Sequence, residues 1–395
     1  MGMPETTTRA RVDSVDLLRG AIMILMALDH TRDFFGDAAA NPTNIATTTT
    51  ALFFTRWVTH FCAPVFFLLS GTGARLSAAR RGTAGISRFL LTRGLWLVLL
   101  EVTVARFVWQ FNLDYRVTIL NVIWALGWAM VALAALVWLP TWAVGAFGAL
   151  MILVHNHFDG MQLAKDSSLG WLMTVLHRPG FLSMSPEHTV FVAYPLIPWI
   201  GVMAVGYWLG GVIQMDTPRR RAWLLRLGLG AVAAFVVLRF TNVYGDFSPW
   251  KHQPTAWFTL LSFINTTKYP PSLLYLLMTL GPALLALRAL DGVQLRGIWS
   301  KVVVYGRVPM FYYLLHVVII HVLAVIASLV RYGTASYMVQ SPSLDKFPAT
   351  QPPGWPSPLP VVWLAWITVV LLAYPCVRWF AGVRARRNDW WLSYL

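Results

Sequence analysis

Ten apolar windows, each about 20 residues long, recur along this chain of 395 residues. A helix of about 20 apolar residues can cross a membrane, because each residue adds about 1.5 Å. Hydrophobic residues make up 57% of the chain and charged residues only 12%, which is too apolar for an ordinary soluble domain. We therefore predict an all-α fold, a polytopic membrane helical bundle with about ten transmembrane helices. The windows are residues 15–35, 57–77, 86–107, 117–139, 141–158, 189–213, 222–240, 270–290, 303–330 and 359–382.

The loop charges predict the orientation of this bundle. Loops on the side of the N terminus hold about twice as many Lys and Arg residues as the other loops, and such loops face the cytosol. An even number of spans also puts both termini on one side. We predict a cytosolic N-terminal tail at residues 1–14, a single transmembrane domain at 15–382 and a cytosolic C-terminal tail at 383–395. The predicted location is the plasma (inner) membrane, with lipids as the surrounding partner.

The formal net charge of +15 does not indicate a nucleic-acid-binding protein. The basic residues lie in short loops between apolar windows and do not form one folded basic face. The sequence contains no HExxH, CxxC or GxxxxGK[ST] motif, so the enzyme classes that depend on those motifs lose support and no metal is expected.

The pattern of residues 16–71 predicts a helix, a loop and a second helix that runs antiparallel to the first. Fourteen residues separate Asp16 from His30, roughly 21 Å along a helix, so polar groups mark both ends of an apolar rod. His60 begins the return helix on the side where His30 ends the first, because consecutive antiparallel helices are usually neighbours. We predict that the two imidazoles and the Asp29 carboxylate converge there as a reaction centre. An imidazole titrates near neutral pH and suits a general base.

Other ionisable groups inside apolar windows also raise functional hypotheses, because they are costly in hydrocarbon. Glu101 lies about 22 Å into the third window, at a depth comparable with His30 and His60. It rivals Asp29 as the group that orients a histidine, since Asp29 points about 100° away from His30 on a helix. His316 is the further candidate, near the middle of the ninth window. The alternative is that these histidines are structural and bond to nearby carbonyl groups.

Six segments spread along the chain carry recognisable motifs. The first is Arg11-x-x-Ser14-x-Asp16-x-x-Arg19-Gly20 followed by Asp29-His30. The others are Thr59–Phe66, Tyr194–Gly201, Asn265–Ser272, Gly306–His316 and Asp389–Tyr394. Together they resemble the bacterial relatives of heparan-alpha-glucosaminide N-acetyltransferase, within the wider transmembrane acyltransferase superfamily. The resemblance covers almost the whole chain.

This resemblance implies a membrane enzyme that uses acetyl-CoA as co-substrate. It would take acetyl from cytosolic acetyl-CoA and deliver it to an amino sugar, another glycan or a similar small molecule on the exoplasmic face. The eukaryotic enzyme carries its catalytic histidine in the loop after the first helix, and residues 31–59 contain none here. His30, as the first candidate, or His60, as the second, would therefore act as the base or accept the acyl group. Glu101 or Asp29 would orient this histidine.

The resemblance also implies binding residues at both ends of the helices. Asn265 and Lys268 would stabilise the thioester oxyanion or hold the acceptor. The CoA phosphates would meet arginines at the inner ends, because a guanidinium group binds phosphate through two parallel hydrogen bonds. Asp16 and Arg19 are spaced to pair at i and i+3. The cofactor-binding candidates are Asp16, Arg19, Arg75 and Arg93.

Two other classes of protein stay open. Prolines interrupt the windows at 189–213 and 270–290, as in secondary transporters whose broken helices line a central site. The absence of two similar halves argues against a transporter. A non-catalytic lipid- or glycan-binding membrane protein is the third class. The acceptor, O- versus N-acylation, the acyl chain length and a homo-oligomeric state stay open too.

Overall fold

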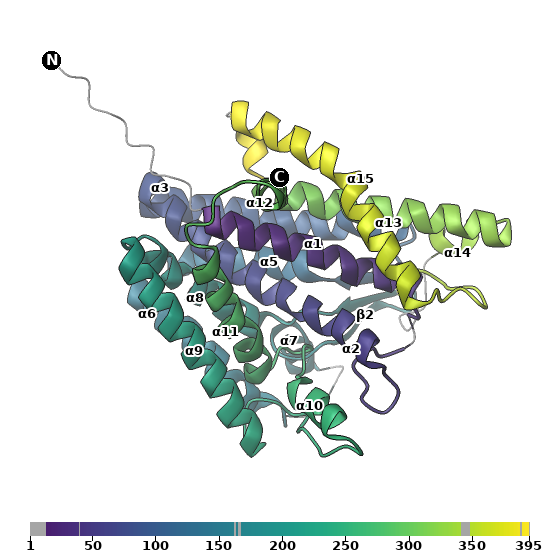
Figure 1. Cartoon of the computed structure of the whole chain (residues 1–395), viewed down its shortest axis with the longest axis horizontal. Helices are drawn as coiled ribbons and strands as arrows, with labels where there is room; N and C mark the ends of the chain where they lie inside the picture. Colours follow the sequence, from purple (N-terminus) through teal and green to yellow (C-terminus); the bar gives the residue numbers. More distant parts are fainter. Residues whose placement is uncertain are drawn as a thin grey trace.

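The structure is a computed structural model that describes residues 13–38, 40–161, 163–164, 167–340, 348–387 and 389–394. These residues form a bundle of helices with one small sheet (Figure 1). Most of the predicted N-terminal tail, residues 1–12, lies outside the described residues, as do residues 388 and 395 of the predicted C-terminal tail. The helices are α1 (Asp13–Phe35), α2 (Thr50–Trp57), η1 (Val58–Phe61), α3 (Cys62–Leu100), η2 (Glu101–Ala105), α4 (Arg106–Gln110), α5 (Val122–Leu136), α6 (Thr141–Val154), η3 (His155–Phe158), α7 (Ser168–Leu176), α8 (Leu196–Ile213), α9 (Thr217–Thr241), α10 (Ala256–Ile264), α11 (Leu273–Leu290), α12 (Ile298–Arg307), α13 (Pro309–Tyr332), α14 (Ser336–Val339), α15 (Leu359–Arg386) and η5 (Trp390–Ser393).

Six helical runs in the described residues are long and apolar enough to cross a membrane. The first run has 61 residues, far more than one crossing needs at about 1.5 Å per residue. It is interrupted at Gly82, whose φ of 67° is left-handed, between the predicted windows at 57–77 and 86–107. Each predicted window contains a helix, but α5 and α6 have only 15 and 14 residues. A multi-pass helical membrane protein is thus supported, and the predicted number of about ten spans is not confirmed. The six runs are Thr50–Gln110, Leu196–Ile213, Thr217–Thr241, Leu273–Leu290, Pro309–Tyr332 and Leu359–Arg386.

Glycines allow α3 and α8 to pack with their backbones in contact. A Cβ atom at Gly71 of α3 would lie 2.0 Å from the carbonyl oxygen of Met203, and one at Gly206 of α8 would lie 2.1 Å from that of Leu68. The Thr72 hydroxyl donates a hydrogen bond of 3.0 Å to the carbonyl of Gly206. Small residues with a hydroxyl contact are typical of helix interfaces in membranes, where close packing replaces the hydrophobic effect.

The first helix, α1, lies in the middle of the bundle and contacts α3, α11, α12, α13 and α15. Its N-terminal end is tied to α12. Arg19 and Asp16 form the predicted i, i+3 ion pair at 2.8 Å, and Arg19 also donates a hydrogen bond of 3.1 Å to the carbonyl of Gly306 in α12. This packing fixes the axis of α1, and with it the direction in which the residues at the opposite end of α1 point.

A three-stranded sheet lies outside the predicted all-α fold. Its strands are β1 (Val117–Leu120), β2 (Gly180–Ser185) and β3 (His188–Val192), in the order β1-β3-β2. β1 runs parallel to β3, and β2 runs antiparallel to it. β1 begins a window that we predicted as helix, because a short apolar run is compatible with either structure. The β-branched residues of β1 and β3 favour the strand.

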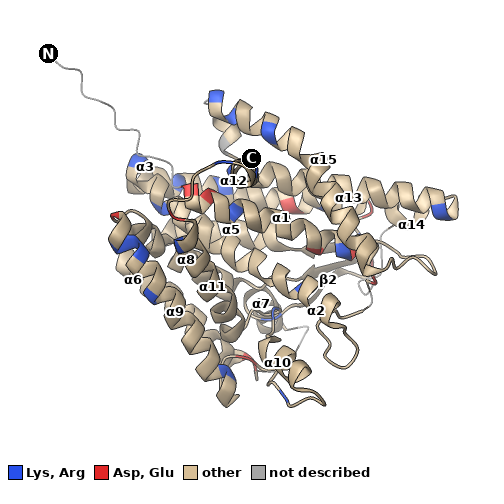
Figure 2. Ribbon diagram, in the orientation of Figure 1, with Lys and Arg blue, Asp and Glu red and all other residues tan. Residues whose placement is uncertain are grey.

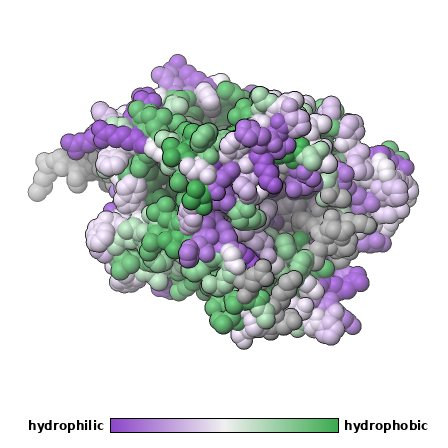
Figure 3. Space-filling view, turned by 90° about the horizontal axis from the view of Figure 1, so that it is seen from below, coloured by the Kyte–Doolittle hydropathy of each residue, from purple (hydrophilic) through white to green (hydrophobic). Residues whose placement is uncertain are grey.

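Basic residues gather at one end of the bundle. Figure 2 shows them around the start of α9, α12 and the end of α15. The long loops and the sheet lie toward the other end (Figure 1). Seen from below in Figure 3, hydrophilic residues occupy the middle of the molecule and hydrophobic residues border them. Exposed apolar side chains such as Val237 and Phe240 of α9 are typical of a helix that faces lipid.

Candidate active site

A cavity of about 590 Å³ lies where the C-terminal end of α1 meets the start of α3, the sheet and the segment before α11. This volume is typical of a site for a small molecule. Its wall combines charged groups with aromatic rings, which suits a polar ligand that also has an apolar face. The charged and aromatic lining residues are Asp29, His30, Arg32, Asp33, Arg56, Lys268, Phe66, Trp109, Phe181, Phe191, Tyr194 and Tyr269.

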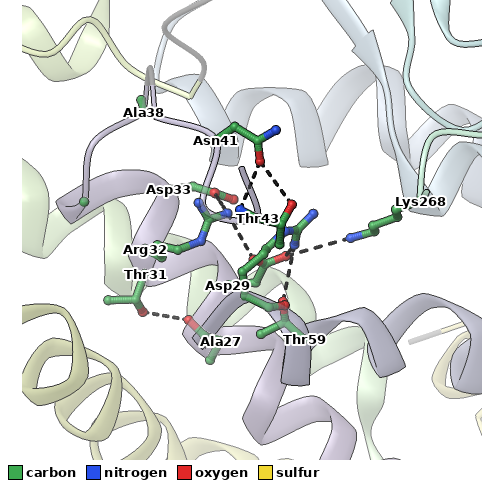
Figure 4. Close-up of polar contacts among 12 residues, drawn as sticks. Ala27, Asp29, Thr31, Arg32, Asp33, Ala38, Asn41, Thr43, Thr59 and Lys268 are labelled. Atoms are coloured by element: carbon green, nitrogen blue, oxygen red, sulfur yellow. Dashed lines mark hydrogen bonds and ion pairs between the residues drawn. The ribbon is translucent and has the colours of Figure 1, made fainter. Parts of the chain in front are cut away.

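Asp29 is the centre of a cluster of charges on this wall (Figure 4). Its Oδ2 atom accepts a short hydrogen bond from Nη1 of Arg56 and lies 4.0 Å from Nζ of Lys268. Its Oδ1 atom lies 3.1 Å from Nη2 of Arg32, which is also 2.6 Å from Oδ1 of Asp33. Three cations therefore face two carboxylates. The excess positive charge favours an oxygen atom that becomes negative in a reaction.

Two cations of this cluster were missed from the sequence. Arg56 lies in the last turn of α2, a helix whose start is capped by the side chain of Thr49, and Arg32 follows His30 in α1. Arg56 is a basic residue just before an apolar window, on the side that we predicted to be poor in Lys and Arg. A basic residue against the predicted charge bias is the signal that could have indicated it.

His30 is hydrogen-bonded to His316 across 286 residues of sequence. Nδ1 of His30 lies 2.8 Å from Nε2 of His316, and Nδ1 of His316 lies 2.7 Å from the carbonyl oxygen of Tyr312. A carbonyl oxygen only accepts, so Nδ1 of His316 carries the hydrogen. When both rings are neutral, Nε2 of His316 accepts and Nδ1 of His30 donates. The lone pair of His30 is then on Nε2.

His30 also lines the cavity. Its ring packs edge-on against Trp109, with 4.7 Å between ring centroids, and nearly parallel to His316 at 5.0 Å. In the part of the chain that the structure describes, His316 is the hydrogen-bond partner of the His30 ring, and Nε2 of His30 has none. A ring nitrogen with a lone pair at the wall of a cavity can take a proton or attack an acyl carbon.

The rings of His30 and His60 have different partners, because His30 is hydrogen-bonded to His316. The ring of His60 packs against Tyr275 of α11 at 5.5 Å, and its carbonyl accepts a hydrogen bond of 2.7 Å from the Tyr275 hydroxyl. His60 is not among the cavity residues that the structure describes. η1, which carries His60, does contact α1, but the His60 ring is turned toward Tyr275 of α11.

Glu101 also lies away from the lining of the cavity. Its Oε2 atom accepts a hydrogen bond of 3.1 Å from the backbone N–H of Trp124, in the first turn of α5. Helix starts have N–H groups without intrahelical partners, and a carboxylate satisfies them. The group that is hydrogen-bonded to the His30 ring is His316, and neither Glu101 nor Asp29 occupies that position.

The two predicted acceptor-binding residues are separated by the structure. Lys268 lines the cavity, where its ammonium group lies 5.1 Å from the ring centroid of Tyr269. Asn265 instead donates a hydrogen bond of 2.8 Å to the carbonyl of Thr43 and does not line the cavity. Burial alone raises the pKa of the Tyr269 phenol, but Lys268 and Arg56 outweigh this effect and hold its pKa below the usual value. Tyr269 is thereby a stronger hydrogen-bond donor.

The predicted cofactor arginines lie away from the cavity lining. Arg19 precedes His30 by eleven residues in α1, a separation of about 16 Å along the helix. The guanidinium groups of Arg75 and Arg93 each lie over an aromatic ring, at 5.6 and 5.8 Å from its centroid. A donor that reaches both these arginines and His30 must therefore be elongated, with its phosphates far from its reactive group.

A cluster outside the cavity was not predicted. Nε2 of His177 lies 2.9 Å from Oδ1 of Asp159, and the Asn156 amide donates to Oδ2 at 2.8 Å. Burial alone raises the pKa of Asp159, but these two hydrogen bonds outweigh it and hold the pKa below its usual value. Asn156 in turn accepts a hydrogen bond from the N–H of Leu273 at 2.8 Å. The cluster therefore ties the segment after α6 to the start of α11.

One family model matches the chain. The model described as "Heparan-alpha-glucosaminide N-acetyltransferase, catalytic" matches residues 11–243, more than half of the chain. This range contains His30 and Arg56 and ends before Lys268 and His316. No curated protein matches the chain.

Proposed function

Because this chain belongs to the heparan-alpha-glucosaminide N-acetyltransferase family, we propose that it transfers an acetyl group from acetyl-CoA to an amino sugar or another glycan. The observation that carries the proposal is the hydrogen bond of 2.8 Å between His30 and His316. It leaves the lone pair of His30 on Nε2, and His30 lines a cavity whose excess cations suit the charge of an acyl-transfer reaction.

The proposed orientation has acetyl-CoA entering from the cytosol and the acceptor binding on the exoplasmic face. About ten spans in one domain would put both termini in the cytosol. The basic end of the bundle supports this orientation, since the CoA phosphates need cations, and the cavity lies toward the other end. Single cysteines introduced at residues 82–85 and 216–222 should then react with an impermeant maleimide only after permeabilisation. Labelling in intact cells would refute the orientation.

In the proposed reaction His30 acts as the base. Nε2 of His30 takes a proton from the acceptor amine or hydroxyl as that group attacks the thioester carbon. The thioester oxygen becomes negative, and Lys268 and Arg56 stabilise it. The carbon–sulfur bond then breaks, the proton on Nε2 passes to the leaving CoA sulfur, and the acetylated acceptor is released. His316 accepts a hydrogen bond from Nδ1–H of His30 throughout the reaction and stabilises the positively charged His30 ring.

Purified protein tests this proposal directly. Protein in detergent receives labelled acetyl-CoA and a panel of amino sugars and oligosaccharides, and both the labelled product and the released CoA thiol are measured. We expect the CoA thiol to be released only when an acceptor is present. Turnover should fall by a factor of about 10² to 10⁴ for His30→Gln. His157→Gln is the matched control, because His157 is exposed and does not line the cavity. Uptake of the sugar into vesicles without acetylation would favour a transporter and refute the proposal.

A further inference from the structure

Lys268 reaches the cavity from a loop and not from a helix. It follows α10, its side chain is 8% exposed, and its Nζ atom lies 4.0 Å from Oδ2 of Asp29. A lysine is a flexible point charge, so its position depends on a rigid backbone. Sites built on loops are less precise than sites on helices unless neighbouring groups fix the loop.

One carboxylate, that of Asp246, fixes both ends of this loop. Its Oδ2 atom accepts hydrogen bonds of 2.8 Å from the backbone N–H of Thr267 and from the hydroxyl of Ser272. Its Oδ1 atom accepts from the Thr267 hydroxyl at 2.7 Å and from the N–H of Ser248 at 2.8 Å. Of the residues that it holds, Thr267 and Ser272 flank Lys268 and Tyr269 in the sequence.

The same loop is closed on itself and joined to α11. The N–H of Ser272 donates to the carbonyl of Thr267 at 3.0 Å, and the Ser272 hydroxyl accepts from the N–H of Tyr275 at 3.0 Å as the cap of α11. Arg239 holds the chain just before the loop, donating to the carbonyls of Phe263 and Asn265 at 2.9 and 2.7 Å. Asp246 is thus the carboxylate to which the turn and the start of α11 are both anchored.

We propose that Asp246 is a positioning residue, which keeps Lys268 against Asp29 during acetyl transfer. Asp246 does not line the cavity, so it would act only through the loop. The inference rests on the proposed function. An asparagine cannot replace Asp246, because its amide has one acceptor oxygen and an NH₂ group that would face the hydrogen-bond donors of the loop.

Three variants test this proposal in the full-length protein. Asp246→Asn removes the charge and half of the acceptor capacity, and Thr267→Val removes the hydroxyl bond alone. Thr266→Val is the matched control, because its hydroxyl bonds to the sulfur of Met278 at 3.6 Å and not to Asp246. We expect kcat to fall about 10- to 100-fold for Asp246→Asn and less for Thr267→Val, with the KM for acetyl-CoA nearly unchanged. Thr266→Val should resemble the wild type.

Two measurements separate positioning from a purely structural role. In a background of Lys268→Met, Asp246→Asn should cause little further loss of kcat, because residues that act as a unit are not additive. Hydrogen exchange of the amides of residues 267–274 should speed up in Asp246→Asn, while the amides of α8 should exchange as in the wild type. This second measurement needs no turnover.

The outcomes are distinct. If the wild type transfers acetyl and Asp246→Asn keeps its kcat, the inference is wrong and the proposed function stands. If Asp246→Asn lowers kcat by the same factor in the wild-type and the Lys268→Met backgrounds, Asp246 does not act through Lys268 and the inference is also wrong. If Asp246→Asn does not fold, Thr267→Val decides by the same two criteria. If the wild type transfers nothing, the proposed function fails and the positioning role of Asp246 fails with it.

Discussion

Replacing His316 should slow acetyl transfer while His30 stays in place at the wall of the cavity. His316→Leu removes the Nε2 atom that accepts a hydrogen bond from His30 Nδ1 at 2.8 Å. It leaves that N–H without this partner in a partly buried site. A hydrogen bond to a charged group contributes about 1.5 to 3 kcal/mol, and this bond is strongest when His30 carries the extra proton. Since about 1.36 kcal/mol is a factor of ten, kcat should fall about 10- to 150-fold.

His316→Gln is the matched variant, because its side-chain oxygen can still accept from His30. We expect it to lose less than His316→Leu. The double variant His30→Ala/His316→Leu should be no slower than His30→Ala alone, since the second residue acts through the first. Each variant is checked for folding by its melting temperature and for acetyl-CoA binding by calorimetry. Equal loss in the glutamine and leucine variants, or strict additivity in the double variant, would refute the proposed chain of hydrogen bonds.

Three further predictions concern the donor, the packing and the pH dependence. Arg19→Ala and Arg93→Ala should each weaken acetyl-CoA binding about 10-fold in a calorimetric titration, as loss of a charge-assisted hydrogen bond implies, and acceptor binding should not change. Gly206→Ala puts a Cβ atom 2.1 Å from a backbone oxygen and should destabilise the fold by about 1 to 3 kcal/mol or more; Gly211→Ala on the same helix meets no atom within 4 Å and should leave the melting temperature unchanged. The pKa of Asp159 lies below its unfolded value, so its contribution is present above about pH 4 and is lost as the pH falls through the folded value. The melting temperatures of wild type and Asp159→Asn should therefore differ at pH 7 and converge in acid.

The helices could be predicted from the sequence because burial in lipid leaves a local pattern. Every apolar window contains a helix, and the pairing of Asp16 with Arg19 follows from spacing on one helix face. The break at Gly82 separates two windows that the sequence already distinguished. These features depend on neighbours within about one helical turn, so reading along the chain is enough.

The site depends on contacts that leave no local pattern. His30 was a candidate because it ends an apolar helix, but its partner His316 lies 286 residues away. Glu101 has the right depth, but depth along one helix does not say which neighbour its carboxylate faces. Lys268 was indicated by the family resemblance, whereas its support by Asp246 needs the fold of the loop. Side-chain convergence between distant helices is set by packing, which spacing alone does not encode.

The hydrogen bond between His30 and His316 also constrains how the protein is made. A ribosome adds about 5 to 20 residues per second, so the 286 residues between the two histidines take about 15 to 60 s to synthesise at that pace. During this time α1 has left the ribosome and α13 has not. A nascent chain or truncated product that ends between residue 243 and the start of α13 therefore contains the whole of the matched family region and still lacks the partner of its proposed base. By the same reasoning as for His316→Leu, such fragments should react with acetyl-CoA more slowly than the full chain while the membrane bundle is being assembled.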